Sequence, residues 1–220
     1  MAVKFAILIS GRGSNMLALA DRMAPVKDKA EITLVAADKS CAGLALAKER
    51  GIATKLCAYQ GRTKSEAEAE LAREIEESGA DYILLAGFMR VLSASFVNRF
   101  EGRILNIHPS LLPKYKGLNT HQRALDAGDT HHGVSVHLVT AGLDEGPLIA
   151  QAAINILTGD DEVSLSGRLL PLEHALYGAA VMALIDGSLT RDGNAYHWHK
   201  CPHISADLGQ LRLPSFRLPS

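Results

Sequence analysis

The chain has 220 residues, 47% of them apolar, which suits one domain with a hydrophobic core and is short for two. Lysine and arginine number 23 against 24 aspartate and glutamate, so a formal charge of −1 does not favour the basic surface of a nucleic-acid-binding protein. No run reaches the roughly 18 apolar residues of a membrane helix, and the cysteines lack CxxC spacing. We expect one cytoplasmic domain with reduced thiols and neither nucleic-acid nor membrane partners.

Strands and helices alternate along the first half of the chain. An apolar run at residues 3–9 ends at glycines 11 and 13, and a stretch with helical spacing follows. The run at 81–88 is apolar enough for a strand buried on both faces. The patterns predict strands at 3–9, 31–38, 54–59 and 81–88, and helices at 16–24, 41–51, 64–78 and 89–100.

The second half continues the alternation and ends differently. Proline 171 either kinks or divides the long helical segment 161–187, and the Asp-Gly pair at 192–193 indicates a final hairpin. Further strands are expected at 103–108, 131–139 and 147–157, with a helix at 120–128.

This order predicts an α/β fold: a single domain with a Rossmann-like, mostly parallel sheet and helices on both faces. In such folds ligands bind beyond the carboxyl ends of the strands. Residues 11–15, 87–90 and 106–110 all fall at such ends.

The loop GRGSN at residues 11–15 lies between a predicted strand and a predicted helix, where backbone N–H groups and the helix dipole can bind phosphate. It lacks the lysine of the Walker pattern, and Met16 stands where the dinucleotide fingerprint has its last glycine. A monophosphate is therefore favoured over a dinucleotide, although a tight turn that merely needs glycines remains an alternative. The candidate phosphate-binding residues are Gly11, Arg12, Gly13, Ser14 and Asn15.

Two polar residues, Asn106 and His108, interrupt an apolar strand at alternate positions. Side chains alternate along a strand, so both can face one site, and the loop HPSLLP after them can hold His108 in one orientation. An amide N–H and a protonated imidazole can stabilise an oxyanion, and the imidazole can pass a proton to a leaving nitrogen. A satisfied structural pair is the alternative interpretation.

A carboxylate near His108 would favour its charged form. Asp144, in the Gly-flanked segment TAGLDEGPLI, is the candidate, and Glu145 competes for the role. Both acids would face water if this segment is only a surface turn.

Two other chemistries are disfavoured. A Ser-His-Asp hydrolase would need a GxSxG elbow, which the chain lacks. His197, His199, Cys201 and His203 alternate and could share a face, but Pro202 interrupts them, so zinc is not expected.

Four segments together, GRGSN, AGFMRVLS, NIHPSLLPKYKG and GLDEGPLI, give the chain its resemblance to a known family. From residue 3 to about 198 it resembles the phosphoribosylglycinamide formyltransferases, which use folate in purine synthesis. The resemblance implies a formyltransferase domain at residues 1–200. The C-terminal tail at 201–220 lies outside it, and with little pattern and three prolines it is predicted to be extended or partly disordered. The resemblance implies transfer of a formyl group from the cosubstrate 10-formyltetrahydrofolate to the amine of glycinamide ribonucleotide, with no metal and no covalent enzyme intermediate.

The resemblance also implies roles for individual residues. Asn106 and His108 would stabilise the tetrahedral oxyanion, and Asp144 would keep His108 charged and assist proton transfer. The implied ribonucleotide site contains Gly11, Arg12, Gly13, Ser14, Asn15 and, at the sugar or amine end, Glu173. The implied folate site contains Lys64, Met89, Arg90, Val91, Leu92 and Asn106.

The chain departs from the family pattern at several of these places. Arg12 replaces a small residue; pointing inward it would add a direct phosphate contact, and pointing outward it would change nothing. Lys64 stands where relatives often have arginine. Lys116 and Asn119 replace a frequent proline and a frequent histidine, and Pro171 precedes Glu173.

Two rivals remain open: a hydrolase that releases formate from formyltetrahydrofolate, and a non-catalytic module that binds folate or nucleotide. The family implies small-molecule substrates only and a monomer or homodimer.

Overall fold

The structure, a computed structural model, describes residues 1–202, 204–205 and 208–212. The chain forms two compact units, residues 1–105 and 106–220, called here the N-terminal and C-terminal units. The first contains β1 (Val3–Ile9), α1 (Ser14–Met23), η1 (Ala24–Val26), β2 (Ala30–Ala37), α2 (Ala42–Glu49), β3 (Thr54–Leu56), α3 (Lys64–Glu77), β4 (Tyr82–Leu85) and α4 (Ala94–Arg99). The second contains α5 (Thr120–Asp126), β6 (His131–Leu138), β7 (Leu148–Asn155), α6 (Glu162–Asp186), β8 (Leu189–Asp192), β9 (Ala195–Trp198) and β10 (Gln210–Arg212), and β5 (Ile104–His108) spans the boundary.

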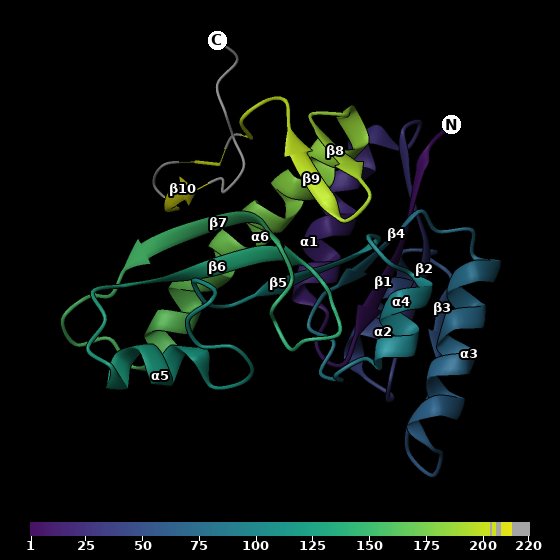
Figure 1. The fold of residues 1–220 in the computed structure, drawn as a ribbon, viewed down its shortest axis with the longest axis horizontal. Helices are drawn as coiled ribbons and strands as arrows, with labels where there is room; N and C mark the ends of the chain where they lie inside the picture. Colours follow the sequence, from purple (N-terminus) through teal and green to yellow (C-terminus); the bar gives the residue numbers. More distant parts are fainter. Residues whose placement is uncertain (203, 206–207, 213–220) are drawn as a thin grey trace. The chain divides into compact units, whose positions relative to one another are not determined.

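The N-terminal unit is built on parallel strands in the order β4-β1-β2-β3 (Figure 1). Strand β1 lies between two neighbours, and its residues from Phe5 to Ile9 are fully buried. A continuous apolar run suits this place because a central parallel strand is covered on both faces. The predicted strand at 3–9 is confirmed residue for residue.

Local features define where helices α1 and α3 begin. Helix α1 begins after Gly13, whose φ is +80° and whose added Cβ would lie 2.9 Å from the Cα of Gly43. Only glycine suits this left-handed, closely packed position. Helix α3 begins with a capping box between Thr63 and Glu66.

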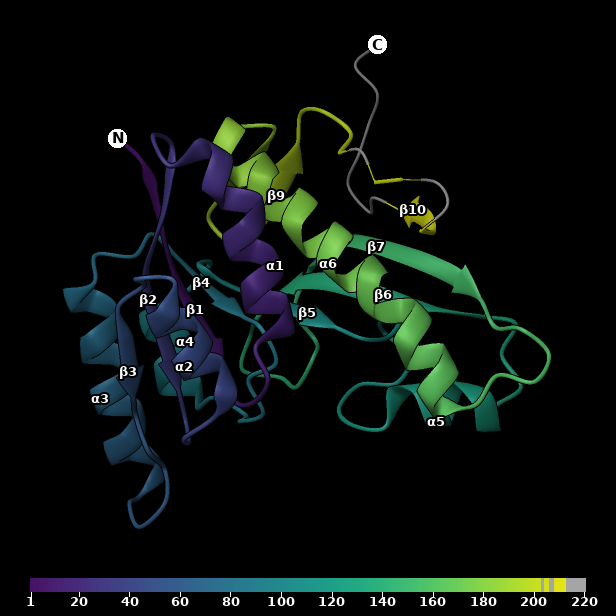
Figure 2. The ribbon, with the colours of Figure 1, turned by 180° about the vertical axis from the view of Figure 1, so that it is seen from behind.

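In the C-terminal unit the strand order is β5-β6-β7-β10. Strands β6 and β7 are antiparallel, and so are β7 and β10. The expected fold class, α/β with a mostly parallel sheet and flanking helices, is confirmed, with the antiparallel pairs as its exception. In both ribbon views α6 runs along β6 and β7 (Figure 2).

Helix α6 continues through Pro171 over 25 residues, so of the two alternatives division is excluded. It begins with a capping box between Asp161 and Ser164 and ends at Gly187, whose φ is +78°. Its length and composition alone would allow it to cross a membrane, but more than half of its most apolar window is buried inside the protein, as in a core helix.

The hairpin cued by the Asp-Gly pair forms between β8 and β9, where Asp192 pairs with Ala195. Its two central residues are Gly193, with φ +58°, and Asn194, one position later than the cue. In the tail, residues 210–212 form β10 against β7. The division of the chain at residue 200 stays a prediction.

Candidate active site

Strand β5 carries Asn106 and His108 to its carboxyl end. His108 is 6% exposed, and its Nε2 donates to the carbonyl oxygen of Tyr115 at 2.9 Å. Its Nδ1 lies 3.5 Å from Oδ2 of Asp144. A carbonyl and a carboxylate can only accept hydrogen bonds, so both contacts favour a proton on each ring nitrogen, which is the cationic imidazole.

Asp144 reaches His108 because its backbone is left-handed, with φ +49°, which is uncommon for a residue other than glycine. Its Oδ2 also accepts a hydrogen bond from the backbone N–H of Gly117 at 2.9 Å. Glu145 instead pairs with Lys116, whose Nζ lies 2.9 Å from its Oε1. Of the two acids, Asp144 is therefore the one that lies beside His108, and the alternative of a turn whose acids both face water is excluded.

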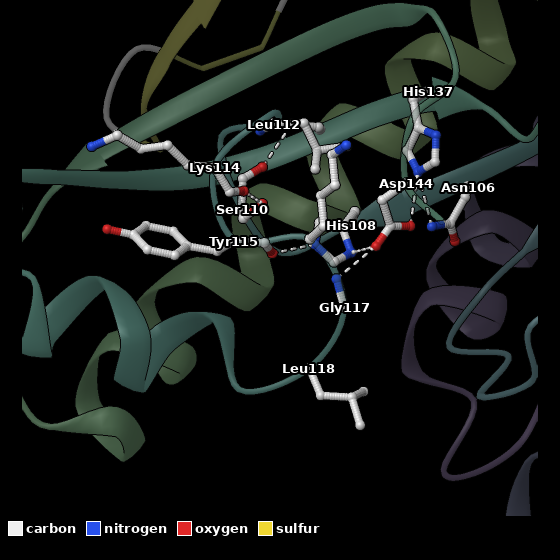
Figure 3. Close-up of polar contacts among 12 residues, drawn as sticks. Asn106, His108, Ser110, Leu112, Lys114, Tyr115, Gly117, Leu118, His137 and Asp144 are labelled. Carbon is white, nitrogen blue, oxygen red and sulfur yellow. Dashed lines mark hydrogen bonds and ion pairs between the residues drawn. The ribbon is translucent and has the colours of Figure 1, made fainter. Parts of the chain in front are cut away.

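A fourth side chain, His137 on β6, completes the cluster (Figure 3). Its Nδ1 donates to the carbonyl of Leu138 at 2.9 Å, so its Nε2 accepts a hydrogen bond from Asn106 Nδ2 at 3.1 Å. Burial lowers the pKa of His137, consistent with a neutral ring. The same Nε2 lies 3.6 Å from Oδ1 of Asp144. His137 therefore fixes the side-chain amide of Asn106 by binding one of its two N–H groups, and the other N–H of Asn106 is not used in this hydrogen bond.

The loop after β5 is anchored by buried polar groups. Ser135 Oγ accepts from Leu112 N and from Gln151 Nε2, and donates to the carbonyl of Ser110. One donated and two accepted bonds use the full capacity of a hydroxyl. Because Tyr115 lies in this loop, the anchors also fix the carbonyl that orients His108 (Figure 3).

The cluster combines an imidazole and an amide, both able to donate hydrogen bonds, with a carboxylate that favours the charged form of the imidazole. Donors fixed in a partly buried site can stabilise an oxyanion without rearranging, because burial weakens competition from water. The geometry brings together three of the residues predicted from sequence: Asn106, His108 and Asp144.

The other candidate residues lie on separate elements. In the N-terminal unit, Gly11 to Asn15 span the connection from β1 to α1, with Ser14 and Asn15 in the first turn of the helix. Arg12 is exposed, and Asn15 is buried. Glu173 is half-buried on α6 in the C-terminal unit.

The turn at 87–93 is tied down at three points within the N-terminal unit. Ser10 Oγ accepts from Met89 N at 2.8 Å, and the buried carboxylate of Asp38 accepts from Arg90 Nε at 2.7 Å. The carboxylate of Glu68 accepts hydrogen bonds from the backbone N–H and the hydroxyl of Ser93.

These ties leave some side chains of the turn exposed. Met89 and Val91 are exposed, whereas Leu92 is buried. Lys64 is exposed in the first turn of α3, and its Nζ lies 3.8 Å from Glu68. The turn thus presents apolar surface on a rigid backbone.

No group of three or more His, Cys, Asp or Glu side chains is placed to hold a metal ion within residues 1–202, 204–205 and 208–212. His199 bonds to Thr190 instead, and His203 of the alternating set lies outside the described residues.

With this geometry in place, comparison with known proteins is informative. The family described as Formyl transferase matches residues 3–181. The chain belongs to the formyl transferase family. It is 45% identical over 191 residues to the phosphoribosylglycinamide formyltransferase of Escherichia coli, which covers 86% of this chain and 90% of that protein.

Solved structures of formyl transferase relatives share the fold. The phosphoribosylglycinamide formyltransferase of Coxiella burnetii superposes with a TM-score of 0.85 at 39% identity, covering 92% of this chain and 96% of that one. The one from Brucella melitensis gives 0.80 at 44% identity, covering 87% and 100%. The resemblance inferred from sequence is confirmed.

The sequence analysis missed His137 and the two backbone groups that contact His108 and Asp144. Ser135 and His137 alternate with valines and leucine on β6, the same pattern that singled out Asn106 and His108. That pattern could have found His137. Backbone atoms of Tyr115 and Gly117 carry no comparable signal.

Proposed function

We propose that this formyl transferase moves a formyl group from 10-formyltetrahydrofolate to the amine of glycinamide ribonucleotide, a step of purine synthesis. The observation that carries the proposal is His108, held between two acceptors beside Asn106. The names of the relatives support the choice of substrates. A cytoplasmic location, small-molecule partners only and a monomeric or homodimeric state belong to the same proposal.

The proposed chemistry is direct transfer. The amine attacks the formyl carbon, which becomes tetrahedral, and its oxygen takes up negative charge. Asn106 and the cationic His108 donate to that oxygen, while Asp144 keeps His108 charged and assists proton transfer. Collapse breaks the bond between the formyl carbon and the folate nitrogen, which takes a proton from His108, while the attacking amine loses one proton and restores the charge of His108. No metal and no covalent enzyme intermediate is needed.

Binding roles are assigned residue by residue from the family pattern. Residues Gly11 to Asn15 hold the phosphate on backbone N–H groups at the start of α1, an arrangement that favours anions. Arg12 departs from the family pattern; as an exposed cation next to that helix start in sequence, it adds a direct phosphate contact in this proposal only if its side chain points toward the phosphate. Glu173 contacts the sugar or the amine. The folate is held by Lys64, Met89, Arg90, Val91, Leu92 and Asn106.

Much of the rate acceleration in this proposal comes from orientation. Holding an amine and an acyl group in attack geometry supplies roughly 7–11 kcal/mol in well-aligned cases. Two groups tied as firmly as His108 and the turn at 87–93 suit this role, because fixed groups need no reorganisation during the reaction.

One assay tests the proposal against its rivals. Purified chain is given formyl folate with and without glycinamide ribonucleotide, and both formylated product and free formate are measured. We expect product only when the ribonucleotide is present and little formate in either case. Formate without ribonucleotide would identify a hydrolase, and binding without turnover would identify a non-catalytic module.

A further inference from the structure

Two loops of the C-terminal unit meet around His108 and Asp144. One, residues 109–118, follows β5, and the other, residues 139–147, connects β6 and β7. Lys116 lies in the first and Glu145 in the second, and their charged groups are 2.9 Å apart. This ion pair belongs to neither strand nor helix, so it joins the loops and nothing else.

The ion pair runs beside a contact that the chemistry uses. Gly117, next to Lys116, donates its N–H to Oδ2 of Asp144, the residue next to Glu145. The same oxygen lies 3.5 Å from His108. The Lys116–Glu145 ion pair and the Gly117–Asp144 hydrogen bond therefore connect the same two loops at adjacent residues. Separation of Lys116 from Glu145 is expected to weaken the Gly117–Asp144 hydrogen bond.

Both loops contain backbone that resists this arrangement. Tyr115 and Asp144 have φ angles of +56° and +49°, in the left-handed region that is unfavourable for side-chain-bearing residues. Strained residues persist only where surrounding contacts hold them. The positions of the two loops relative to each other thus depend on the contacts between them.

The carbonyl oxygen of Lys116 has a separate anchor. Arg123 on α5 donates to it, at 2.6 Å, and also to the carbonyl of Leu118. These hydrogen bonds fix the backbone of Lys116, and its ammonium group lies against the carboxylate of Glu145. The lysine side chain is 36% exposed and the glutamate 59%, so solvent weakens but does not abolish their attraction.

We propose that Lys116 and Glu145 are positioning residues that hold Asp144 against His108 during formyl transfer. The proposal rests on the catalytic roles given above to His108 and Asp144. The pair acts through the Gly117–Asp144 hydrogen bond and touches no reacting atom itself. It links the loops by charge, at positions where a lysine stands in place of the proline frequent in the family.

Charge reversal separates this role from a general structural one. The variants are Lys116→Met, Glu145→Gln, and the double variant Lys116→Glu/Glu145→Lys, in which the attraction is restored with its direction reversed. Three readouts are taken: kcat, KM for each substrate, and the hydrogen-exchange rate of the Gly117 amide. The exchange rate needs no substrate.

Asp21 and Arg50 provide a matched control pair in the N-terminal unit. Their ion pair is also 2.9 Å long, with side-chain exposures of 67% and 37%. Asp21→Asn should leave kcat and the Gly117 exchange rate unchanged, because it removes a comparable surface pair without touching either loop.

We expect each single variant to lower kcat and speed Gly117 exchange by about two- to fivefold, the range of an exposed ion pair, with both KM values nearly unchanged. The double variant should recover both. Failure of the double variant to recover, unchanged Gly117 exchange in the single variants, or an equal effect of Asp21→Asn would each overturn the proposal. Absence of formyl transfer by the unmodified chain would instead overturn the proposed function, and the exchange series would still report on the ion pair.

Discussion

Histidines in two places of the C-terminal unit have different ring partners. His108 is 6% exposed and lies between a carbonyl and a carboxylate. His132 is 1% exposed, and its Nε2 lies 3.2 Å from Nδ1 of His121. Burial lowers the pKa of both His121 and His132, the latter to about 4, and the neighbouring His121 lowers the pKa of His132 further.

The comparison teaches that burial lowers the pKa of an imidazole, whereas an acceptor at each ring nitrogen favours its protonated form. A ring that faces two acceptors can carry charge and donate protons, whereas a ring that faces another imidazole stays neutral at neutral pH. Burial also lowers the pKa of His137, so its ring resembles His121 and His132 in favouring the neutral form, although it lies beside His108 and orients Asn106.

Removal of Asp144, the carboxylate partner of His108, should have the largest effect, because it removes the group that favours a charged ring at His108. Asp144→Asn replaces an acceptor that holds the cation with a neutral amide, so we expect kcat to fall by about 10²-fold or more with little change in ligand affinity. Steady-state kinetics and equilibrium binding of each substrate measure the two effects. Asp126→Asn, an exposed acid on α5, is the control. Turnover that survives in Asp144→Asn would remove Asp144 from the mechanism.

The neutral pair should appear in the pH dependence of stability. The folded-state pKa of His132, about 4, is below the unfolded value of about 6.5, so the unfolded chain takes up a proton first as pH falls. The free energy of unfolding should therefore decrease from pH 6.5 to 4, by up to about 3 kcal/mol from this residue. Urea unfolding at several pH values tests this. In His132→Gln the slope should be shallower, and an identical slope would contradict the assignment.

The smallest effect concerns the contact between the two neutral rings. His121→Gln removes a neighbour whose charge lowers the pKa of His132, so that pKa should rise while burial still keeps it below the ordinary value of 6.5. NMR titration of the His132 ring in both proteins gives the comparison. A pKa that stays in place would assign the shift to burial alone.

The fold was predictable where local pattern and packing agree. The apolar run at 3–9 became β1, because only a central parallel strand buries such a run on both sides. Pro171 was harder to interpret from sequence. It is exposed in α6, so the carbonyl that loses its helical donor can be solvated and the helix continues.

The site was predictable where it depends on strand periodicity. Asn106 and His108 emerged from alternation on β5. The choice between Asp144 and Glu145 required the left-handed backbone of Asp144, which no residue pattern encodes. The Tyr115 carbonyl and the Gly117 amide depend on how the loop folds back, which is a property of three-dimensional packing.

Strand β10 lies after the segment that resembles the family, yet it gives β7 an antiparallel neighbour. An added Cβ on Gly209 would lie 2.7 Å from the carbonyl oxygen of Ala153, so a larger residue at this position would push the incoming strand away. A chain cut before residue 208 would expose main-chain donors and acceptors along β7, and an exposed strand edge can pair with the edge of another molecule. In the structure β10 occupies this edge of β7 and pairs with these main-chain groups.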